Sequence, residues 1–249
     1  MKRKYRLPRP GKSLSIAKKD LKIYYGKGPV VIFGILLPFF FFFAFLVGRE
    51  MPPLSLIAGL SGMAIWFTST SISPVIAPWE TRTKTLERLV SSPISVIEMI
   101  LGDIMGSMTL AFSISAVTVF AVAGILGLMP FNFITLLLGI ILASFCFSAI
   151  GVLISSIPTD TTSDIMMLST LIKFPLIFVS GIFIPTSKLP GWGEVISQLS
   201  PLTYFVDLVR FSFSGSGSPW IDIGALFGFS LFFLLAADFS HRRTLPRRL

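Results

Sequence analysis

Long apolar runs alternate with short polar segments along most of the chain. Six runs approach or exceed the roughly 18 to 20 residues that an α-helix needs to cross a bilayer. A single soluble core would not need runs of this length, so the pattern predicts an all-α polytopic membrane protein with six transmembrane helices. The predicted spans lie at about residues 29–47, 54–77, 104–129, 131–156, 165–184 and 219–238.

The polar segments fall on two sides when six helices cross the membrane. Residues 48–53 and 130–131 form short outer turns, whereas residues 78–103 and 157–164 face the cytoplasm. The outer segment 185–218 is too polar for a full span and too apolar for a loop. We expect it to form a re-entrant hairpin of two short helices in the outer leaflet, which is allowed where protein covers the backbone.

Basic residues gather at both ends of the chain. The net charge is +9, and ten of the 21 Lys and Arg lie in residues 1–28. Four more are Arg242, Arg243, Arg247 and Arg248. Both clusters flank predicted spans, so we expect both termini to be cytoplasmic, in a multi-pass protein of the cell membrane that contacts anionic lipid. The chain then divides into a basic N-terminus 1–28, a transmembrane domain 29–238 and a basic tail 239–249.

The N-terminal segment SLSIAKKDLKIYY, residues 13–25, has helical periodicity. Its apolar positions are Leu14, Ala17, Leu21 and Tyr24, and they lie opposite Lys18, Lys19 and Lys22. This pattern is typical of an amphipathic helix that lies on the cytoplasmic leaflet. The alternative is a basic anchor without fixed structure.

The chain lacks the residues that several classes of function require. The single cysteine, Cys146, allows no disulfide and no cysteine metal site. Gly11-Lys12-Ser13 matches the end of a P-loop, but position 6, where that motif needs glycine, is Arg6. The positive charge has no interleaved aromatic residues, so a nucleic-acid partner is not expected. A cleaved signal peptide is not expected either, because Gly48-Arg49-Glu50 does not resemble a cleavage site.

Catalytic clusters are also missing from the sequence. The single histidine, His241, sits beside Arg242 and Arg243 in the basic tail, where we expect it to contact lipid headgroups. No HExxH or GxSxG motif and no clustered carboxylates occur. We therefore expect no enzymatic activity, cofactor or metal site in this chain.

The segment WETRTKTLERLVSSPIS, residues 79–95, is charged although apolar spans flank it. Leu86, Leu89 and Val90 fall on one helical face, and Glu80 and Lys84 can form an i,i+4 ion pair. This predicts a short amphipathic helix, which is either a solvated interfacial loop or a docking helix for a cytoplasmic partner. Ser92-Pro93 is predicted to be the N-cap and first residue of the next helix, whose positive end would favour Glu98 and Asp103.

Lys173 is the most unusual charge, because it lies near the middle of the fifth predicted span. A lysine there costs about 3 kcal/mol on insertion scales, so it should face a partner or a cavity. It either makes hydrogen bonds inside the bundle or lines a pathway for an anionic or polar group. Asp160 and Asp164, roughly 13 to 20 Å along the helix, are too distant to pair with it. Asp207 and Arg210 are expected to pair with each other or to cap a gate.

The charged segment resembles the coupling-helix signature of the permease subunits of ABC type-2 exporters. The matching residues are Glu80, Arg82, Thr85-Leu86-Glu87, Leu89 and Ser92-Pro93-Ile94-Ser95. Two positions depart from the pattern: the glycine before the threonine is Lys84, and the common Gly-Lys is Gly102-Asp103. These departures concern the details of partner docking.

Two later segments are similar to further motifs of the same family. FPLIFVSGIFIPTSKLPGW, residues 174–192, matches at Pro175, Ser180-Gly181, Pro185, Leu189-Pro190 and Trp192. LSPLTYFVDLVR, residues 199–210, matches at Pro201, Leu202, Thr203, Tyr204 and Arg210. Each motif alone is weak, but the three occur in order and cover the chain from about residue 14 to residue 238.

The resemblance implies a transmembrane subunit that exports a drug-like, lipid or other amphipathic substrate. Cytoplasmic ABC ATPase subunits would bind ATP and Mg, and a second copy or a sister permease would complete the pathway. The implied docking residues of the coupling helix are Glu80, Arg82, Thr85, Leu86, Glu87, Arg88 and Leu89. The implied pathway or gate residues are Lys173, Pro175, Ser180, Gly181, Pro201, Tyr204 and Arg210. The alternative is a stand-alone ion-coupled transporter or channel, which would need several intramembrane acids or broken helices.

Overall fold

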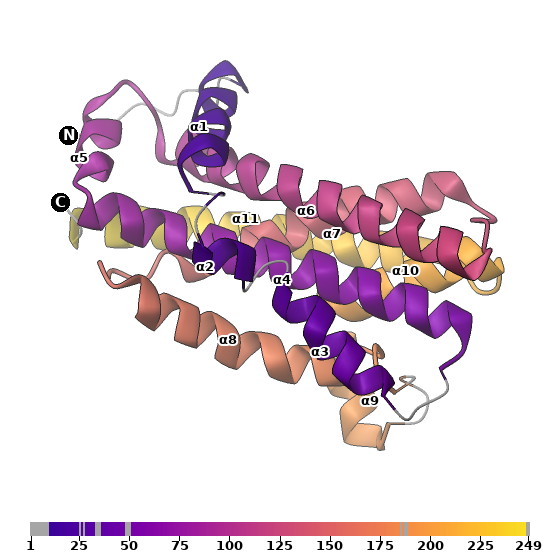
Figure 1. The fold of residues 1–249 in the computed structure, drawn as a ribbon. Helices are drawn as coiled ribbons and strands as arrows, with labels where there is room; N and C mark the ends of the chain where they lie inside the picture. Colours follow the sequence, from indigo (N-terminus) through magenta and orange to yellow (C-terminus); the bar gives the residue numbers. More distant parts are fainter. Residues whose placement is uncertain are drawn as a thin grey trace.

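The structure, a computed structural model, describes residues 10–24, 26, 28–32, 36–47, 51–184, 186 and 189–247. The regular elements of this part are helices, and no strand occurs in it (Figure 1). The α-helices are α1 (Pro10–Ile23), α2 (Gly28–Val31), α3 (Leu37–Leu46), α4 (Pro53–Arg82), α5 (Thr85–Ser91), α6 (Val96–Leu126), α7 (Phe133–Ile154), α8 (Thr162–Val179), α9 (Gly191–Gln198), α10 (Pro201–Ser214) and α11 (Pro219–Thr244). A short 3-10 helix, η3 (Leu245–Arg247), follows α11.

Five helices are long and apolar enough to cross a membrane: α4, α6, α7, α8 and α11. They correspond to the second to sixth predicted spans, and they confirm an all-helical multi-pass membrane protein. The first predicted span, 29–47, contains α2 and α3, but residues 33–35 between them lie outside the described part. A sixth span therefore stays a prediction.

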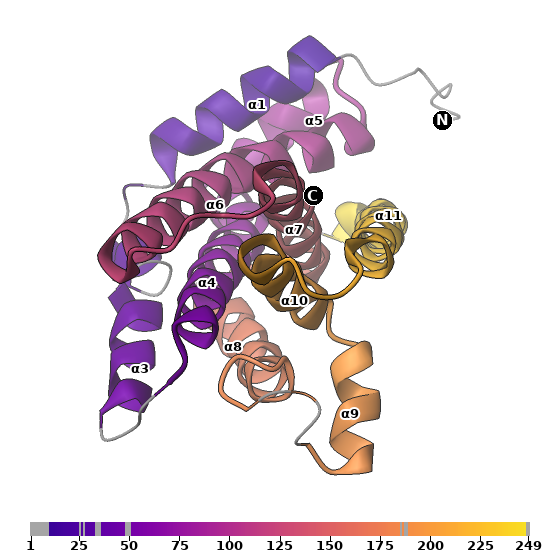
Figure 2. The same cartoon turned by 90° about the vertical axis from the view of Figure 1, so that its right-hand side faces the viewer.

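The buried centre of the bundle is α4, as the end-on view in Figure 2 shows. Its most apolar window is 89% buried, against 28% for α6, 22% for α8 and 17% for α11. Trp66 of α4 contacts Phe147 of α7 edge to face, with ring centroids 4.8 Å apart, and Phe147 contacts Phe205 of α10 at 6.3 Å. The helices around α4 thus leave apolar sides facing outward, as expected for helices in contact with lipid.

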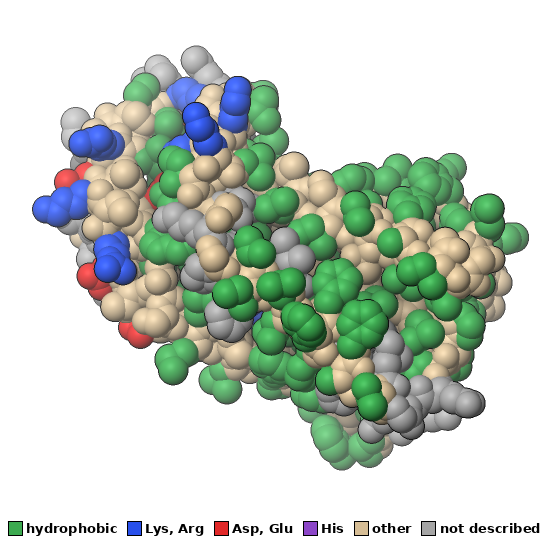
Figure 3. Space-filling model, in the orientation of Figure 1, with side chains coloured by type: hydrophobic (Ala, Val, Ile, Leu, Met, Phe, Trp, Pro, Cys, Tyr) green, Lys and Arg blue, Asp and Glu red, His purple; other side chains and the backbone are tan. Residues whose placement is uncertain are grey.

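Charge and apolar surface separate along the bundle. Helices α1 and α5 and the end of α11 lie together at one end, whereas α9 lies near the other (Figure 1). In the same orientation, the space-filling view shows Lys, Arg, Asp and Glu gathered over the α1 and α5 end and hydrophobic side chains over the rest (Figure 3). The segment 185–218 contains two short helices, α9 and α10, in agreement with the predicted number, and its re-entrant position in the outer leaflet stays a prediction.

Several helix ends differ from the sequence-based prediction. Helix α4 continues into the charged segment as far as Arg82, and α5 begins only at Thr85. Between them Lys84 adopts a left-handed conformation with φ 55°, so Glu80 and Lys84 do not share one helix and their i,i+4 pair is not formed. The predicted N-cap at Ser92 is also wrong. Ser95 caps α6 through a capping box with Glu98, which satisfies two backbone N–H groups reciprocally.

Candidate functional site

Helix α5 stands at the charged end of the bundle with one side buried and one side exposed. Its Leu86 is only 2% exposed and packs with Ile16 of α1 and Met99 of α6. The exposed residues from Arg82 to the end of α5 are Arg82, Thr83, Lys84, Thr85, Glu87, Arg88 and Ser91. The structure therefore divides the seven predicted docking residues. Arg82, Thr85, Glu87 and Arg88 are exposed and Leu89 is half-buried, but Glu80 and Leu86 are buried.

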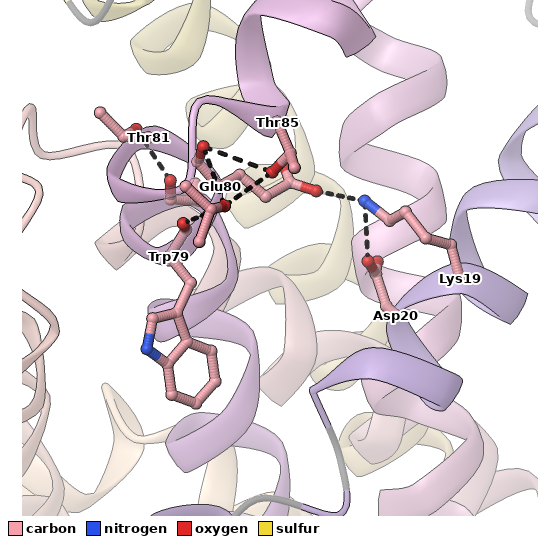
Figure 4. Close-up of polar contacts among 8 residues, drawn as sticks. Lys19, Asp20, Trp79, Glu80, Thr81 and Thr85 are labelled. Carbon is pink, nitrogen blue, oxygen red and sulfur yellow. Dashed lines mark hydrogen bonds and ion pairs between the residues drawn. The ribbon is translucent and has the colours of Figure 1, made fainter.

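Glu80 points into the bundle rather than toward solvent. Its carboxylate forms an ion pair with Lys19 of α1, and Lys19 Nζ also lies 3.0 Å from Asp20 Oδ1 (Figure 4). The Thr85 hydroxyl donates a hydrogen bond to the backbone oxygen of Glu80 at 3.4 Å, across the turn between α4 and α5. Polar contacts thus join α1, the end of α4 and the start of α5.

Burial opposes the charge of Lys19, but the carboxylates of Glu80, Asp20 and Asp103 outweigh it and raise the pKa of Lys19 above its ordinary value. Lys19 consequently stays protonated at physiological pH. Burial raises the pKa of Asp20, and the neighbouring lysine only partly offsets this. Burial also raises the pKa of Tyr24 to about 12, and its ring stacks on Trp79 with centroids 5.5 Å apart.

Helix α1 is an ordered helix that packs closely on α6, which argues against an unstructured basic anchor. A Cβ atom on Gly102 of α6 would lie 2.6 Å from Ile16 Cβ, so glycine is needed for this approach. Lys12 donates to the backbone oxygen of Pro93 and lies 3.9 Å from Glu98 Oε2. The contact face agrees in part with the predicted apolar face. Ala17 and Tyr24 are buried as predicted, whereas Leu14 is 59% exposed. Ser13, Ile16 and Asp20 are buried as well.

His241 does not lie at the surface, contrary to the prediction of a headgroup contact. It is 7% exposed, and its Nε2 lies 2.9 Å from the backbone oxygen of Val152 and 3.3 Å from Ser155 Oγ. A carbonyl oxygen only accepts, so Nε2 carries the proton and donates to Val152. His241 therefore fastens α11 to α7. It also lines a cavity of about 10 Å³ together with Glu80 and Asp103.

The predicted pathway residues fall in two places. Lys173 of α8 is buried against α4, where its Nζ donates to Ser71 Oγ at 2.8 Å and lies 5.8 Å from the centre of the Phe67 ring. Pro175 lies inside α8 and lines an open groove of about 780 Å³ with Met166, Met167, Thr170 and Phe174, among others. Lys173 is thus hydrogen-bonded inside the bundle.

The other pathway residues cluster around α9, α10 and the end of α8. Arg210 Nη1 lies 3.1 Å from Asp207 Oδ1, which confirms that these two residues pair. Arg210 Nη2 also donates to the backbone oxygen of Gly181 at 2.5 Å, where Gly181 has φ 81°. Ser180 caps α8 by donating to Ile177 O at 2.8 Å.

Pro201 and Tyr204 lie at the start of α10. Pro201 is buried in the first turn, and the Tyr204 hydroxyl donates to the backbone oxygen of Gln198 at 2.7 Å. These contacts join α9 to α10. The structure therefore brings Ser180, Gly181 and Arg210 together and leaves Lys173 deeper in the bundle, in the middle of α8.

Sequence reasoning missed the ionic contacts between α1 and α4. It assigned Lys19 to a solvated face and Glu80 to a docking surface, and it gave no role to Asp20. The available signal was the position of Asp20, since it lies four residues after Ile16 and four before Tyr24, on the side of α1 that faces the bundle.

Within the described residues, no group of three or more His, Cys, Asp or Glu could hold a metal ion.

Comparison with known proteins gives a family match for most of the chain. The sequence profile of the ABC-2 type transporter family matches residues 15–214. Nodulation protein J of Rhizobium meliloti is 23% identical over 167 residues, which are 67% of this chain and 62% of that protein. The inner membrane transport permease YadH of Escherichia coli K12 is 24% identical over 160 residues, which are 61% of this chain and 59% of YadH.

A further relative matches a shorter segment. The putative transport permease ycf38 of Cyanophora paradoxa is 33% identical over 72 residues, 29% of this chain and 24% of ycf38. The matched regions cover less than two thirds of each of these relatives. The family profile, in contrast, covers most of this chain, including α5, α8 and α10. The chain therefore belongs to the ABC-2 type transporter family.

Proposed function

We propose that the chain is the permease subunit of an ATP-driven exporter, and that a separate cytoplasmic ATPase docks on the exposed side of α5. The observation that carries the proposal is the division of α5 into a packed side and an exposed charged side. Leu86 fixes the helix on α1 and α6, while Glu87 and Arg88 stay exposed at the charged end of the bundle. A rigidly mounted helix transmits a displacement better than a flexible loop does.

A push on α5 would reach the transmembrane helices by two routes. The first is the short turn from Arg82 to Thr85, which joins α5 directly to the central helix α4. The second is the packing of Leu86 on α1 and α6, next to the ion pair between Glu80 and Lys19. In this proposal Glu80 and Leu86 transmit the movement, and Arg82, Thr85, Glu87, Arg88 and Leu89 make the contact with the ATPase.

The proposed assembly follows from the same reasoning. Six spans, with residues 29–47 as the first, place the basic segments 1–28 and 239–249 in the cytoplasm of a cell-membrane protein. The domain 29–238 pairs with a second copy or with a sister permease. ATP and Mg bind to the ATPase subunits. In this proposal Lys173, at the buried contact of α8 with α4, is the charge that meets a polar group of the substrate.

The proposed substrate is an amphipathic molecule such as a lipid or a drug-like compound. The groove beside Pro175 is lined by Met, Phe, Leu and Thr side chains, which suits an apolar group with few polar atoms. Gly181 and Arg210, joined by a hydrogen bond, would form part of an outer gate together with Ser180, Pro201 and Tyr204.

Co-purification tests the docking surface. We would express the chain with candidate ABC ATPases from the same genome, solubilise the membranes in mild detergent and measure how much ATPase elutes with it. The double variant Glu87→Arg and Arg88→Glu reverses two exposed charges on α5 and should release the ATPase. Lys22→Glu, an exposed charge on α1, is the matched control and should retain it.

The two failures of this experiment have different meanings. If the α5 variant and the control retain the ATPase equally, α5 is not the docking surface. If no ATPase elutes with the wild-type chain under several detergent and nucleotide conditions, the exporter proposal is wrong and ion-coupled transport by the chain alone becomes the next hypothesis.

A further inference from the structure

The contact between α1 and α6 contains more carboxyl groups than basic groups. Asp20 of α1 is 0% exposed and Asp103 of α6 is 6% exposed. Lys19 and Glu80 are the other charged groups that act on Asp103, so one ammonium faces three carboxyl groups within the described residues. Three buried carboxylates beside a single cation would leave two uncompensated charges, which a protein interior does not tolerate.

One oxygen atom of each aspartate lacks a hydrogen-bond donor among the described residues. Lys19 is committed to Glu80, although its Nζ also lies 3.0 Å from Asp20 Oδ1. No hydrogen-bond donor among the described residues reaches Asp20 Oδ2 or Asp103 Oδ1, and both atoms are buried. The two carboxyl groups lie within hydrogen-bonding reach of each other. Two carboxylates at this distance repel, whereas a carboxylic acid beside a carboxylate forms a strong hydrogen bond.

The backbone holds the two groups at this distance. Gly102 precedes Asp103 and lets α1 approach so closely that a Cβ there would lie 3.0 Å from the backbone oxygen of Ser13. Two further titratable groups lie nearby. Tyr24 directly follows α1, and burial raises its pKa to about 12, so it stays neutral. His241 of α11 lines the cavity beside Asp103, and its Nε2 faces the backbone oxygen of Val152.

We propose that Asp20 and Asp103 form a proton-binding site in which one proton, shared between the two carboxyl groups at neutral pH, holds α1 against α6. The proton satisfies the orphan oxygens and removes one of the two excess charges. Lys19 then lies between Glu80 and the remaining negative charge of the pair, and one excess negative charge is left among these four groups instead of two. This inference concerns the joint between α1 and α6 and does not depend on the docking of an ATPase.

The sign of the pH effect follows from the direction of the Asp20 shift. The folded chain keeps a proton that the unfolded chain releases above the ordinary aspartate value of 3.8, because burial raises the pKa of Asp20. The stabilisation is complete below that value and is lost as pH rises and the folded pair releases its proton. While the folded pair keeps the proton, each pH unit changes the unfolding equilibrium by about tenfold.

Infrared spectroscopy of the purified full chain at about pH 7, in a maltoside detergent that contains no carbonyl group, tests the site directly. A protonated carboxyl group has a C=O stretch that ionised carboxylates lack. We expect this band in the wild type and a lower intensity in Asp103→Asn, measured as the difference between the two spectra, because Asp20 alone beside Lys19 ionises. The control Asp164→Asn changes an exposed carboxylate at the start of α8 and should leave the band unchanged. Asp103→Leu, of similar size, replaces the Asn variant if that chain does not assemble.

The pH profile of thermal unfolding gives a second reading from the same samples. Above the ordinary aspartate value of 3.8 the unfolding midpoint of the wild type should fall as pH rises, and Asp103→Asn should lose that part of the slope. A wild-type spectrum without the band, or a band of unchanged intensity in both Asp103 variants, would overturn the proposal. A slope that is the same in the wild type and in Asp103→Asn would also overturn it.

Discussion

Gly102 provides a sharp test of the way α1 is mounted on the bundle. In Gly102→Ala the new Cβ would lie 2.6 Å from Ile16 Cβ and 3.0 Å from the backbone oxygen of Ser13. The clashing atoms are a backbone oxygen and the Cβ of a branched side chain, neither of which can rotate away. The clash can therefore be relieved only if α1 moves away from α6. Overpacking of this kind costs about 1 to 3 kcal/mol. This cost is partly offset, because alanine is favoured over glycine inside a helix by about 1 kcal/mol.

Gly124 is a matched control in the same helix. A Cβ at Gly124 meets nothing within 4 Å, so Gly124→Ala keeps the helix gain without the clash. The two variants should therefore differ by the clash alone, about 1 to 3 kcal/mol. In a chain of this size that corresponds to an unfolding midpoint roughly 2 to 12 °C lower for Gly102→Ala.

Thermal unfolding followed by tryptophan fluorescence, with both variants in the same detergent, measures this difference. Limited proteolysis of the N-terminal segment should also cut Gly102→Ala faster, because α1 is displaced. Equal midpoints and equal proteolysis in the two variants would show that α1 does not pack closely on α6 at this position. The proposed contact of Asp20 with Asp103 would then be wrong as well.

Three further substitutions test separate contacts. Lys19→Met should destabilise the chain by about 2 kcal/mol, which is less than the loss of a fully buried ion pair costs, because the lysine side chain is 28% exposed. Lys18→Met, which changes an exposed neighbour, should leave the unfolding midpoint unchanged. Equal effects of the two variants would contradict the ion pair between Lys19 and Glu80. Ser95→Ala should cost about 1 kcal/mol through loss of the capping box, seen as a lower denaturation midpoint, and no change would refute the assigned helix start. Lys173→Met should raise the unfolding midpoint, since Ser71 offers only a neutral hydroxyl, and should reduce substrate-stimulated ATP turnover by the assembled complex. A lower midpoint with unchanged stimulation would contradict both parts.

The transmembrane architecture could be predicted because it depends on local composition. Each of α4, α6, α7, α8 and α11 matches an apolar run whose length alone fixes its ability to span the bilayer. Helix ends were predicted less well, because the start of a helix depends on which of several neighbouring polar residues caps it. Ser92-Pro93 and Ser95 both precede an apolar run, and only the reciprocal bonds between Ser95 and Glu98 decide for the later start.

The site could be predicted only in part, because burial depends on tertiary packing. The charged segment and its exposed residues Glu87 and Arg88 were visible from sequence. The inward direction of Glu80 was not, because it depends on a lysine sixty-one positions earlier, on a helix brought close by Gly102. His241 shows the same limit: its basic neighbours suggested the surface, but the packing of α11 on α7 buries it.

Site-directed cross-linking from α5 tests the central claim most directly. The chain has one cysteine, the buried Cys146, so Cys146→Ser gives a background in which Glu87→Cys can carry a photoactivatable cross-linker. Ser216→Cys, exposed beyond the end of α10, is the control. The account predicts that position 87 cross-links to the co-expressed ATPase and that position 216 does not. Cross-linking from neither position in a complex that still hydrolyses ATP on addition of substrate, or equal cross-linking from both, would contradict the account.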